Sequence, residues 1–369
     1  RNGKMKVMDI ARVMEELAPA RLAEDGDKIG LQVGDPAAEV RTLTLTLSPS
    51  AAALAHAIKH RAQMVISHHP LIFRPLAGLT NSTPTERIVS GLVRAGISLF
   101  AAHTNYDSAP GGVNDVLAGL LGIRNVQPLM QAATRLRKVV VFVPNDHLEK
   151  VSAAICNAGA GRLGAYRDCT FRSEGVGTFT PLEGARPFIG KRGKTERVAE
   201  VRLESIVPEE CVDGVVSAIR RAHPYEEPAF DVFALETPRG EHGLGRWGEL
   251  AKPVPLRRFA STVRRKLGAP GVRYVGDGDR SIRKVAVCGG AGGDFYMHAL
   301  RHGCDLFVTG DVKYHVFIEA QQLGLAVIDA GHGHTELPGV RALQPRLAGL
   351  LPGVKVLLGE AEDKMIRTA

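Results

Sequence analysis

The sequence predicts an α/β protein in which two repeated α/β units form one core, with a ferredoxin-like α+β domain inserted between them. Three observations support this fold class. Strand-like and helical segments alternate on both sides of the middle, which is typical of parallel sheets covered by helices. The middle follows the order β-α-β-β-α-β of the ferredoxin-like plan. Two stretches in the flanking parts align with each other without gaps.

Length and composition agree with several domains. The chain has 369 residues, more than the roughly 250–300 that one hydrophobic core usually supports. No apolar run approaches the roughly 20 residues that span a bilayer, so we expect no membrane partner, and the first residues lack the apolar core of a signal peptide. The five cysteines are scattered without a C-x-x-C pair, which favours a reduced compartment, and we expect a cytoplasmic protein.

The N-terminal part, expected to span residues 5–136, begins with an amphipathic helix and continues with strands and helices in alternation. Its predicted elements are helix 8–22, strand 42–47, helix 50–62, strand 64–67, helix 81–96, strand 97–102 and helix 116–121. Residues 25–36 are predicted to form a loop because glycines and aspartates interrupt the pattern.

The inserted domain is expected to span residues 137–240. Its predicted elements are strand 138–144, helix 146–157, strands 166–170 and 175–180, strand 196–205, helix 208–222 and strand 230–235. The turn His223-Pro224-Tyr225-Glu226-Glu227-Pro228 precedes the last strand. We interpret it as a structural turn or subunit contact, with a binding role as the alternative.

The C-terminal part, expected to span residues 241–369, resumes the alternation of strands and helices predicted for the N-terminal part. A glycine-rich bridge is predicted over residues 243–250, followed by helix 255–267, strand 284–288, helix 294–302, strands 305–309 and 325–329, and a closing strand 354–358.

An internal repeat connects the two flanking parts. Residues 55–60 and 64–67 align with 297–302 and 306–309, and residues 96–102 resemble 324–330. Each copy ends in a cluster of histidines. Two copies of one α/β unit could face their strand ends toward a shared cleft; chance similarity of two helix–strand units is the alternative.

Adjacent histidines follow the strand 64–67. His68 and His69 come directly after it, and Pro70 prevents the strand from continuing. Ligands of open α/β sheets bind beyond the carboxyl ends of the strands. Because neighbouring strand residues point to opposite faces, two adjacent imidazoles that both belong to one site imply a kink in the chain or two separate ligands, such as two metal ions. A loop with two solvent-facing histidines is the alternative.

Two more polar clusters follow later strands, at residues 103–107 and 332–336. His332 and Glu336 are four residues apart, so a helical turn would place both on one side. Imidazole nitrogen together with carboxylate oxygen suits zinc, manganese or iron. Candidate ligands from three strand ends are too many for one tetrahedral ion that keeps an open position, and they suit two ions.

Other features indicate anion binding less specifically. The loop of residues 289–293, with Gly289, Gly290, Gly292 and Gly293, lies between a strand and a helix and could bind a phosphate through backbone N–H groups. A tight turn is the alternative. The net charge is +8, and basic residues gather in 257–284 and 186–197; such runs attract nucleic acid or are simply solvated faces.

Five motifs together resemble the Nif-three-like family, whose members are often labelled GTP cyclohydrolase type 2 homologs. The motifs lie at residues 29–34, 67–70, 102–107, 309–311 and 331–336. The middle resembles the PII- or CutA-like insert of the longer bacterial members. Asp27-Lys28-Ile29-Gly30-Leu31 departs from the family's common Asp-Asn-Val-Gly-Leu, so any role of the usual asparagine does not carry over.

The resemblance implies a dinuclear metal site with His68, His69, Asp107, His332 and Glu336 as ligands. Glu336 would bridge the two divalent ions (Zn, Mn or Fe), and His103 would be a nearby group that handles protons. The family also implies a homohexamer, as a trimer of dimers.

Two functions are compatible with these residues. The first is a metal-dependent hydrolase that acts on a nucleotide or a phosphorylated small molecule, with His103 or His334 moving protons. The second is a non-enzymatic metal-binding or regulatory ring that engages nucleic acid through its basic surface.

Overall fold

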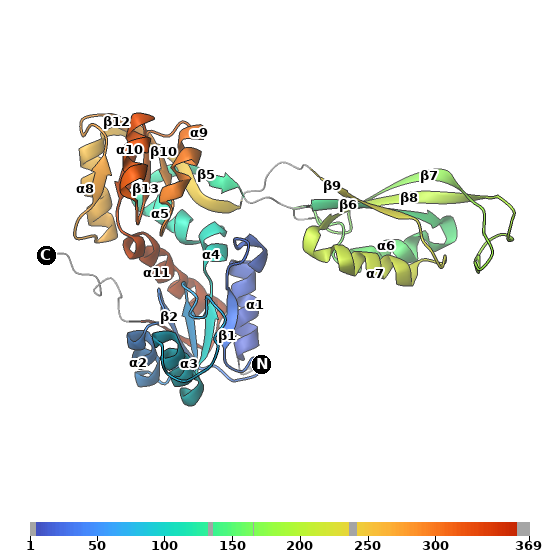
Figure 1. Cartoon of the computed structure of the whole chain (residues 1–369), viewed down its shortest axis with the longest axis horizontal. Helices are drawn as coiled ribbons and strands as arrows, with labels where there is room; N and C mark the ends of the chain where they lie inside the picture. The colour runs from blue at the N-terminus through green and yellow to red at the C-terminus, as the bar shows by residue number, and fades with distance from the viewer. Residues whose placement is uncertain (1–4, 132–135, 165, 236–241, 360–369) are drawn as a thin grey trace. The chain divides into compact units, whose positions relative to one another are not determined.

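The computed structural model describes residues 5–131, 136–164, 166–235 and 242–359 (Figure 1). The chain forms two compact units: unit 1 combines residues 1–132 and 240–369, and unit 2 contains residues 133–239. Both flanking parts therefore share one compact unit, and its division into halves at 5–136 and 241–369 stays a prediction. The expected boundary between residues 240 and 241 lies outside the described residues.

The first sheet of unit 1 has five strands in the order β1-β4-β3-β2-β15. Only β1 runs antiparallel to its neighbour; the other pairs are parallel. The strands are β1 (Gly30–Val33), β2 (Thr42–Thr46), β3 (Met64–Ser67), β4 (Ser98–Ala101) and β15 (Lys355–Leu358). β3 and β4 carry apolar side chains on both faces, as expected of parallel strands buried on both sides, whereas β2 alternates leucine with buried threonine.

Helices cover both faces of this sheet. One core contains Ile10 of α1 (Val7–Leu17), Ile66 of β3 and Leu343 of α11 (His332–Leu350). The other contains Ala57 of α2 (Ala51–Lys59) and Leu92 of α3 (Pro84–Ala95), packed with strand residues.

The second sheet of unit 1 has six strands in the order β11-β14-β13-β12-β10-β5. β12, β13 and β14 are parallel, and the remaining pairs are antiparallel. The strands are β5 (Ile123–Gln131), β10 (Gly243–Pro255), β11 (Arg273–Val275), β12 (Ser281–Val287), β13 (Leu306–Thr309) and β14 (Ala326–Asp329).

Helices from both parts of the chain pack on the second sheet. One core joins it to α5 (Val113–Leu121) and α8 (Leu256–Leu267), and another joins it to α9 (Tyr296–Arg301) and α10 (Tyr314–Gln322). The short helix α4 (Thr104–Ser108) follows β4. Each sheet also receives a strand from the other part of the chain, since β15 ends the first sheet and β5 the second. This exchange binds the two sheets into one unit.

Unit 2 is built from β6 (Leu136–Pro144), α6 (Leu148–Asn157), β7 (Thr170–Phe179), β8 (Glu196–Pro208), α7 (Val212–Ala222) and β9 (Phe230–Ala234). Its four strands are antiparallel in the order β7-β8-β6-β9. Val141, Leu203, Ile155 and Ile219 belong to the core in which α6 and α7 pack on one face of this sheet. Four short 3-10 helices complete the described elements, at Ala20–Leu22, Asn145–His147, Glu209–Cys211 and Gly293–Phe295.

The mixed α/β class is confirmed, and several local predictions are wrong. Residues 243–250, predicted as a bridge, belong to β10, and part of the loop predicted at 25–36 forms β1. A Cβ at Gly248 would lie 2.3 Å from the Arg124 carbonyl oxygen of β5. These glycines therefore permit close strand approach, which the sequence alone does not distinguish from a turn. The sequence analysis also divided β7 into strands 166–170 and 175–180, and it omitted β5, β11, α4, α10 and α11. α11 continues through Pro338 and Pro345.

In the part of the chain that the structure describes, none of the helices combines the length and the apolar character needed to span a bilayer.

Candidate metal centre

Parallel strands that end at the same level place the first histidines. Thr46 of β2 pairs with Ser67 of β3, and Ser67 pairs with Ala101 of β4. Just beyond these ends, the His68 N–H donates to the Thr46 carbonyl (3.1 Å). His68 and His69 therefore leave the sheet as a continuation of β3 with a fixed backbone. After β4 the chain turns directly into α4, which carries Asp107 on its single turn.

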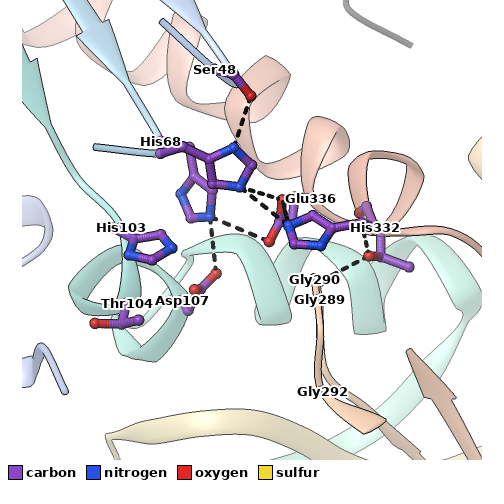
Figure 2. Close-up of polar contacts among 12 residues, drawn as sticks. Ser48, His68, His103, Thr104, Asp107, Gly289, Gly290, Gly292, His332 and Glu336 are labelled. Atoms are coloured by element: carbon purple, nitrogen blue, oxygen red, sulfur yellow. Dashed lines mark hydrogen bonds and ion pairs between the residues drawn. The ribbon is translucent and has the colours of Figure 1, made fainter. Parts of the chain in front are cut away.

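The third group comes from the start of α11. Gly331 follows β14 with φ of +84°, a left-handed angle that suits glycine, and α11 begins at His332. Glu336 lies one turn later and faces the same side as His332. Figure 2 shows these two side chains pointing toward His68 and Asp107. Segments more than 200 residues apart thus meet at one point, as the sequence analysis predicted.

The imidazole nitrogens and carboxylate oxygens converge within a few ångströms. His68 Nε2 lies 3.6 Å from both Asp107 Oδ1 and Glu336 Oε1. Glu336 Oε2 lies 3.1 Å from His69 Nε2 and 3.2 Å from His332 Nε2. The two oxygens of Glu336 therefore face different sets of histidines.

A second partner fixes the ring of each of these histidines. The Nδ1 of His68 donates to the Ala102 carbonyl (2.9 Å), and the Nδ1 of His69 is 2.8 Å from the Ser48 hydroxyl. The Nδ1 of His332 lies 2.7 Å from the Asp311 carboxylate. These contacts leave the three Nε2 atoms pointing into the cluster. Metal-binding histidines are held in this way.

Two atoms of the cluster are buried without a hydrogen-bond partner among the described residues, namely His68 Nε2 and Asp107 Oδ1. Burying unpaired polar atoms is costly. These two atoms lie 3.6 Å apart, and a group bound between them would satisfy both. Two overlapping sets could hold a metal ion: His68 with His69 and His103, and His69 with His332 and Glu336. A cation is the group that fits an assembly of imidazole nitrogens and carboxylate oxygens.

The charges of the cluster are strongly coupled. Burial would lower the pKa of His68, but the Asp107 and Glu336 carboxylates raise it to about 9. The Glu336 contact, working against burial, also raises the pKa of His332 to about 9. Burial raises the pKa of Asp107 to about 7. Glu336 has its pKa well below the usual range because the histidine contacts outweigh burial. Without a cation, the raised pKa values therefore favour the protonated forms of His68 and His332 near pH 7.

His103 lies beside the cluster, with ring centroids 5.3 Å from His68 and 5.7 Å from His69. Its Nδ1 contacts the Asp27 carboxylate at 2.9 and 3.0 Å, and the Thr104 hydroxyl donates to the same carboxylate. Burial lowers the pKa of His103 despite Asp27. The ring is therefore neutral near pH 7, and its Nε2 is available to accept a proton.

His334 is outside this arrangement. It is half-buried on α11 and makes no hydrogen bond or ion pair with another described residue. Its neighbours His332 and Glu336 face the cluster, and helical spacing turns residue 334 away from them. Nothing in the contacts supports its predicted part in proton transfer.

The glycine loop approaches the site, but three of its amides have other partners. The N–H groups of Gly289, Gly290 and Gly292 donate to the side chains of Asn114, Thr335 and Thr309. They are not free for a phosphate, and the contacts do not support the predicted anion role. Gly290 instead makes room for the cluster: with φ of +68°, its Cβ would lie 2.2 Å from Glu336 Oε1.

The sequence analysis assigned no supporting role to three residues that contact the histidines: Asp27, Ser48 and Asp311. Asp311 follows the end of β13, so a carboxylate just past a strand end was an available signal. Ser48 read as the start of a helix, and Asp27 lies in a loop whose folding back onto α4 has no local signature.

The fold and the cluster together define an α/β protein with a histidine–glutamate group that could hold a metal ion beyond the strand ends. The chain belongs to the Duf34/NIF3 (NGG1p interacting factor 3) family, which matches residues 5–364. The resemblance seen in the motifs is thereby confirmed.

Relatives match along most of the chain. A Bacillus subtilis protein named GTP cyclohydrolase 1 type 2 homolog is 43% identical over 324 residues, covering 88% of this chain and 87% of that protein. A Mycobacterium tuberculosis protein of the same name is 40% identical over 90% of this chain and 89% of its own length. The crystal structure of a Bacillus cereus protein related to NIF3 has a TM-score of 0.78 at 40% identity, covering 100% of both chains. A Staphylococcus aureus protein has a TM-score of 0.82 at 28% identity, covering 99% of both chains.

Proposed function

We propose that the cluster binds two divalent metal ions and that the protein is a metal-dependent hydrolase acting on a nucleotide or a phosphorylated small molecule. The observation that carries this proposal is the Glu336 carboxylate, whose Oε1 faces His68 and whose Oε2 faces His69 and His332.

The spacing of the donor atoms fits metal coordination. Ligands at about 2.0–2.2 Å from a tetrahedral ion are roughly 3.3–3.6 Å apart. The Nε2–oxygen distances in the cluster are 3.1–3.6 Å. His68, Asp107 and Glu336 Oε1 would hold one ion, and His69, His332 and Glu336 Oε2 the other. This assignment uses the two buried atoms without partners at the first position.

Two ions so placed would activate water and stabilise the charge that develops on a phosphoryl group or a purine ring. The protein's own residues supply orientation and proton transfer. Asp27 holds His103 by its Nδ1, so that the neutral ring can accept a proton at Nε2 beside the cluster. Ser48 and Asp311 keep the rings of His69 and His332 in place.

The substrate class rests on the relatives rather than on this site. Several relatives carry the name GTP cyclohydrolase 1 type 2 homolog, which makes GTP the first compound to test. No contact of the described residues selects guanine, and a phosphoester is the second compound.

Metal content and turnover measured together test the proposal. Protein purified without chelator should contain up to two zinc, manganese or iron ions per chain by elemental analysis, and should turn over GTP or bis(p-nitrophenyl) phosphate. Glu336→Gln and His69→Ala should lose metal and activity together. The exposed His60→Ala is the matched control and should keep both.

His103→Gln separates a proton-handling residue from a ligand. We expect this variant to keep its metal content and to lose activity by about 10²–10⁴-fold. A fall in metal content would instead make His103 a ligand. Metal-loaded protein that turns over neither compound, with salt-dependent DNA binding unchanged in Glu336→Gln, would favour the non-enzymatic ring.

We also infer the finer architecture that the sequence predicted. The order β9-β6-β8-β7 and the sequence β-α-β-β-α-β support a ferredoxin-like unit 2. The parallel sets β2-β3-β4 and β12-β13-β14, each with an antiparallel edge strand beside its last member, support the repeat. The homohexamer is tested by light scattering of the full chain.

A further inference from the structure

Unit 2 contains a pocket of about 610 Å³, within the range of roughly 300–1,000 Å³ common for small-molecule sites. Val141 and Val143 of β6 belong to the helix-covered core. Phe142 lies between them, so its side chain points to the other face of the sheet and lines the pocket. None of the lining residues belongs to the metal centre.

Aromatic rings form one wall of the pocket. Tyr225 comes from the turn 223–228 that the sequence analysis singled out. Its ring centroid lies 5.7 Å from that of Phe179 and 6.3 Å from that of Phe188. Faces of such rings attract cations as well as apolar groups.

The charged groups of the pocket are mostly acidic. Four carboxylates and one guanidinium line it: Glu174, Glu200, Glu226, Glu227 and Arg202. The guanidinium already has partners, because Arg202 Nε donates to Glu204 at 2.7 Å and its Cζ lies 6.0 Å from the centroid of the Phe142 ring. The pocket therefore carries an excess of negative charge.

Glu200 is the most informative of these carboxylates. Its residue is 8% exposed, and it forms no ion pair with a described residue. The chain leaves room for it, since a Cβ at Gly177 would lie 2.1 Å from Glu200 Oε2. A buried carboxylate without a counter-charge is costly, so this arrangement indicates a charge supplied from outside.

The groups behind Glu200 do not supply that charge. His223 donates through Nε2 to the Phe142 carbonyl and accepts the Tyr225 N–H at Nδ1, so its ring is neutral. The Tyr225 hydroxyl is buried and has no hydrogen-bond partner of ordinary geometry in the described residues. Burial, together with the nearby Glu200 carboxylate, raises the pKa of this phenol, which keeps it a neutral donor and acceptor.

We propose that this pocket binds a small organic cation, a protonated amine with an apolar or aromatic body. The ammonium group would lie against Glu200 and the Tyr225 hydroxyl, and the apolar body would pack among Phe142, Phe179 and Phe188. This site is independent of the proposed metal chemistry.

Calorimetric titration of the full chain with 2-phenylethylamine at pH 7 tests the proposal, with the neutral isostere 2-phenylethanol as the comparison ligand. We expect saturable binding of the amine, at least about tenfold tighter than that of the alcohol, because a charge-assisted hydrogen bond is worth about that factor. Glu200→Gln should remove this preference while leaving the alcohol's affinity unchanged.

Three further variants serve as controls for the binding experiment. Glu149→Gln removes an exposed carboxylate of the same unit outside the pocket and should not change binding. Phe188→Ala, at a residue that is 56% exposed and so tolerant of change, should weaken both ligands. Glu336→Gln should bind the amine as the native chain does, which separates this site from the metal centre.

Equal affinities for amine and alcohol, an unchanged amine affinity in Glu200→Gln, or no saturable binding at millimolar concentration would each overturn the proposal. A smaller mass in solution for Phe188→Ala, without amine binding by the native chain, would assign the pocket to self-association and overturn it as well.

Discussion

Replacing Gly290 with alanine tests whether the glycine loop exists to make room for the metal centre. The new Cβ would lie 2.2 Å from Glu336 Oε1 and 3.4 Å from His332 Nε2. The first distance is too short for any real contact, so the carboxylate or the loop has to move. Because Glu336 faces histidines through both oxygens, a displacement disturbs both proposed ion positions at once.

The expected effect of Gly290→Ala has two parts, a loss of folding stability and a loss of metal affinity. Alanine at a φ of +68° costs about 1–2 kcal/mol of folding free energy, because the left-handed region is unfavourable for residues with a Cβ. Displacing Glu336 adds a loss of metal affinity of roughly 10–100-fold, the size seen when a support of a metal site is removed.

Gly303→Ala is the matched control. Gly303 has a φ of +66°, but its Cβ would meet nothing within 4 Å. Both variants should therefore lose stability in urea unfolding of metal-stripped protein, and Gly290→Ala should lose at least as much as Gly303→Ala. Only Gly290→Ala should lose metal when dialysed against a competing chelator, as measured by elemental analysis. Equal metal retention by the two variants would refute the reasoning.

Three further predictions concern charge. In metal-stripped protein, the pKa of His68 is raised to about 9, so its contribution to stability is complete below the unfolded pKa near 6.5 and is lost as pH rises to 9. The pKa of Asp107 is raised to about 7, so its contribution to stability is lost as pH rises from about 4 to 7. The melting temperature should thus fall with pH, and added zinc should stabilise more as pH rises because it displaces these protons; parallel curves with and without zinc would contradict this. Arg246→Met should lower the free energy of unfolding, measured in guanidinium chloride, by about 3 kcal/mol, because it removes a buried side chain that binds Asp115 and three backbone carbonyls. A loss below about 1 kcal/mol would show that the ion pair is dispensable. Asp27→Asn should lower the pKa of the neighbouring imidazole in an NMR titration, because a carboxylate that favours its charged form is lost; an unchanged or higher pKa would contradict the contact.

Much of the fold could be predicted because its strands are short apolar runs between helical patterns. Strand 64–67 was placed at its observed bounds, and strand 97–102 differs by one residue at each end. The errors arise where tertiary contacts override local signals. The sequence analysis omitted α11, which contains Pro338 and Pro345; proline usually breaks a helix, but α11 continues through both residues and packs in the core of the first sheet.

The site was predictable as far as its residues stand at strand ends. His68, His69, Asp107, His332 and Glu336 meet as expected. The roles predicted for His334 and the glycine amides gain no support from the contacts and stay predictions. The role of Gly290 could not be foreseen, because a glycine needed for close approach looks the same in sequence as a glycine needed for a turn.

By itself, the sequence determined which residues have metal-binding chemistry and that they follow strands, since residue type and periodicity are local properties. Only the tertiary structure decided which nitrogen of each histidine faces the cluster, because that choice depends on the distant partners Ser48, Ala102 and Asp311. It alone also left Glu200 buried without a counter-charge in unit 2. Burial and the direction of a side chain are set by residues far away in the chain, and no local pattern records them.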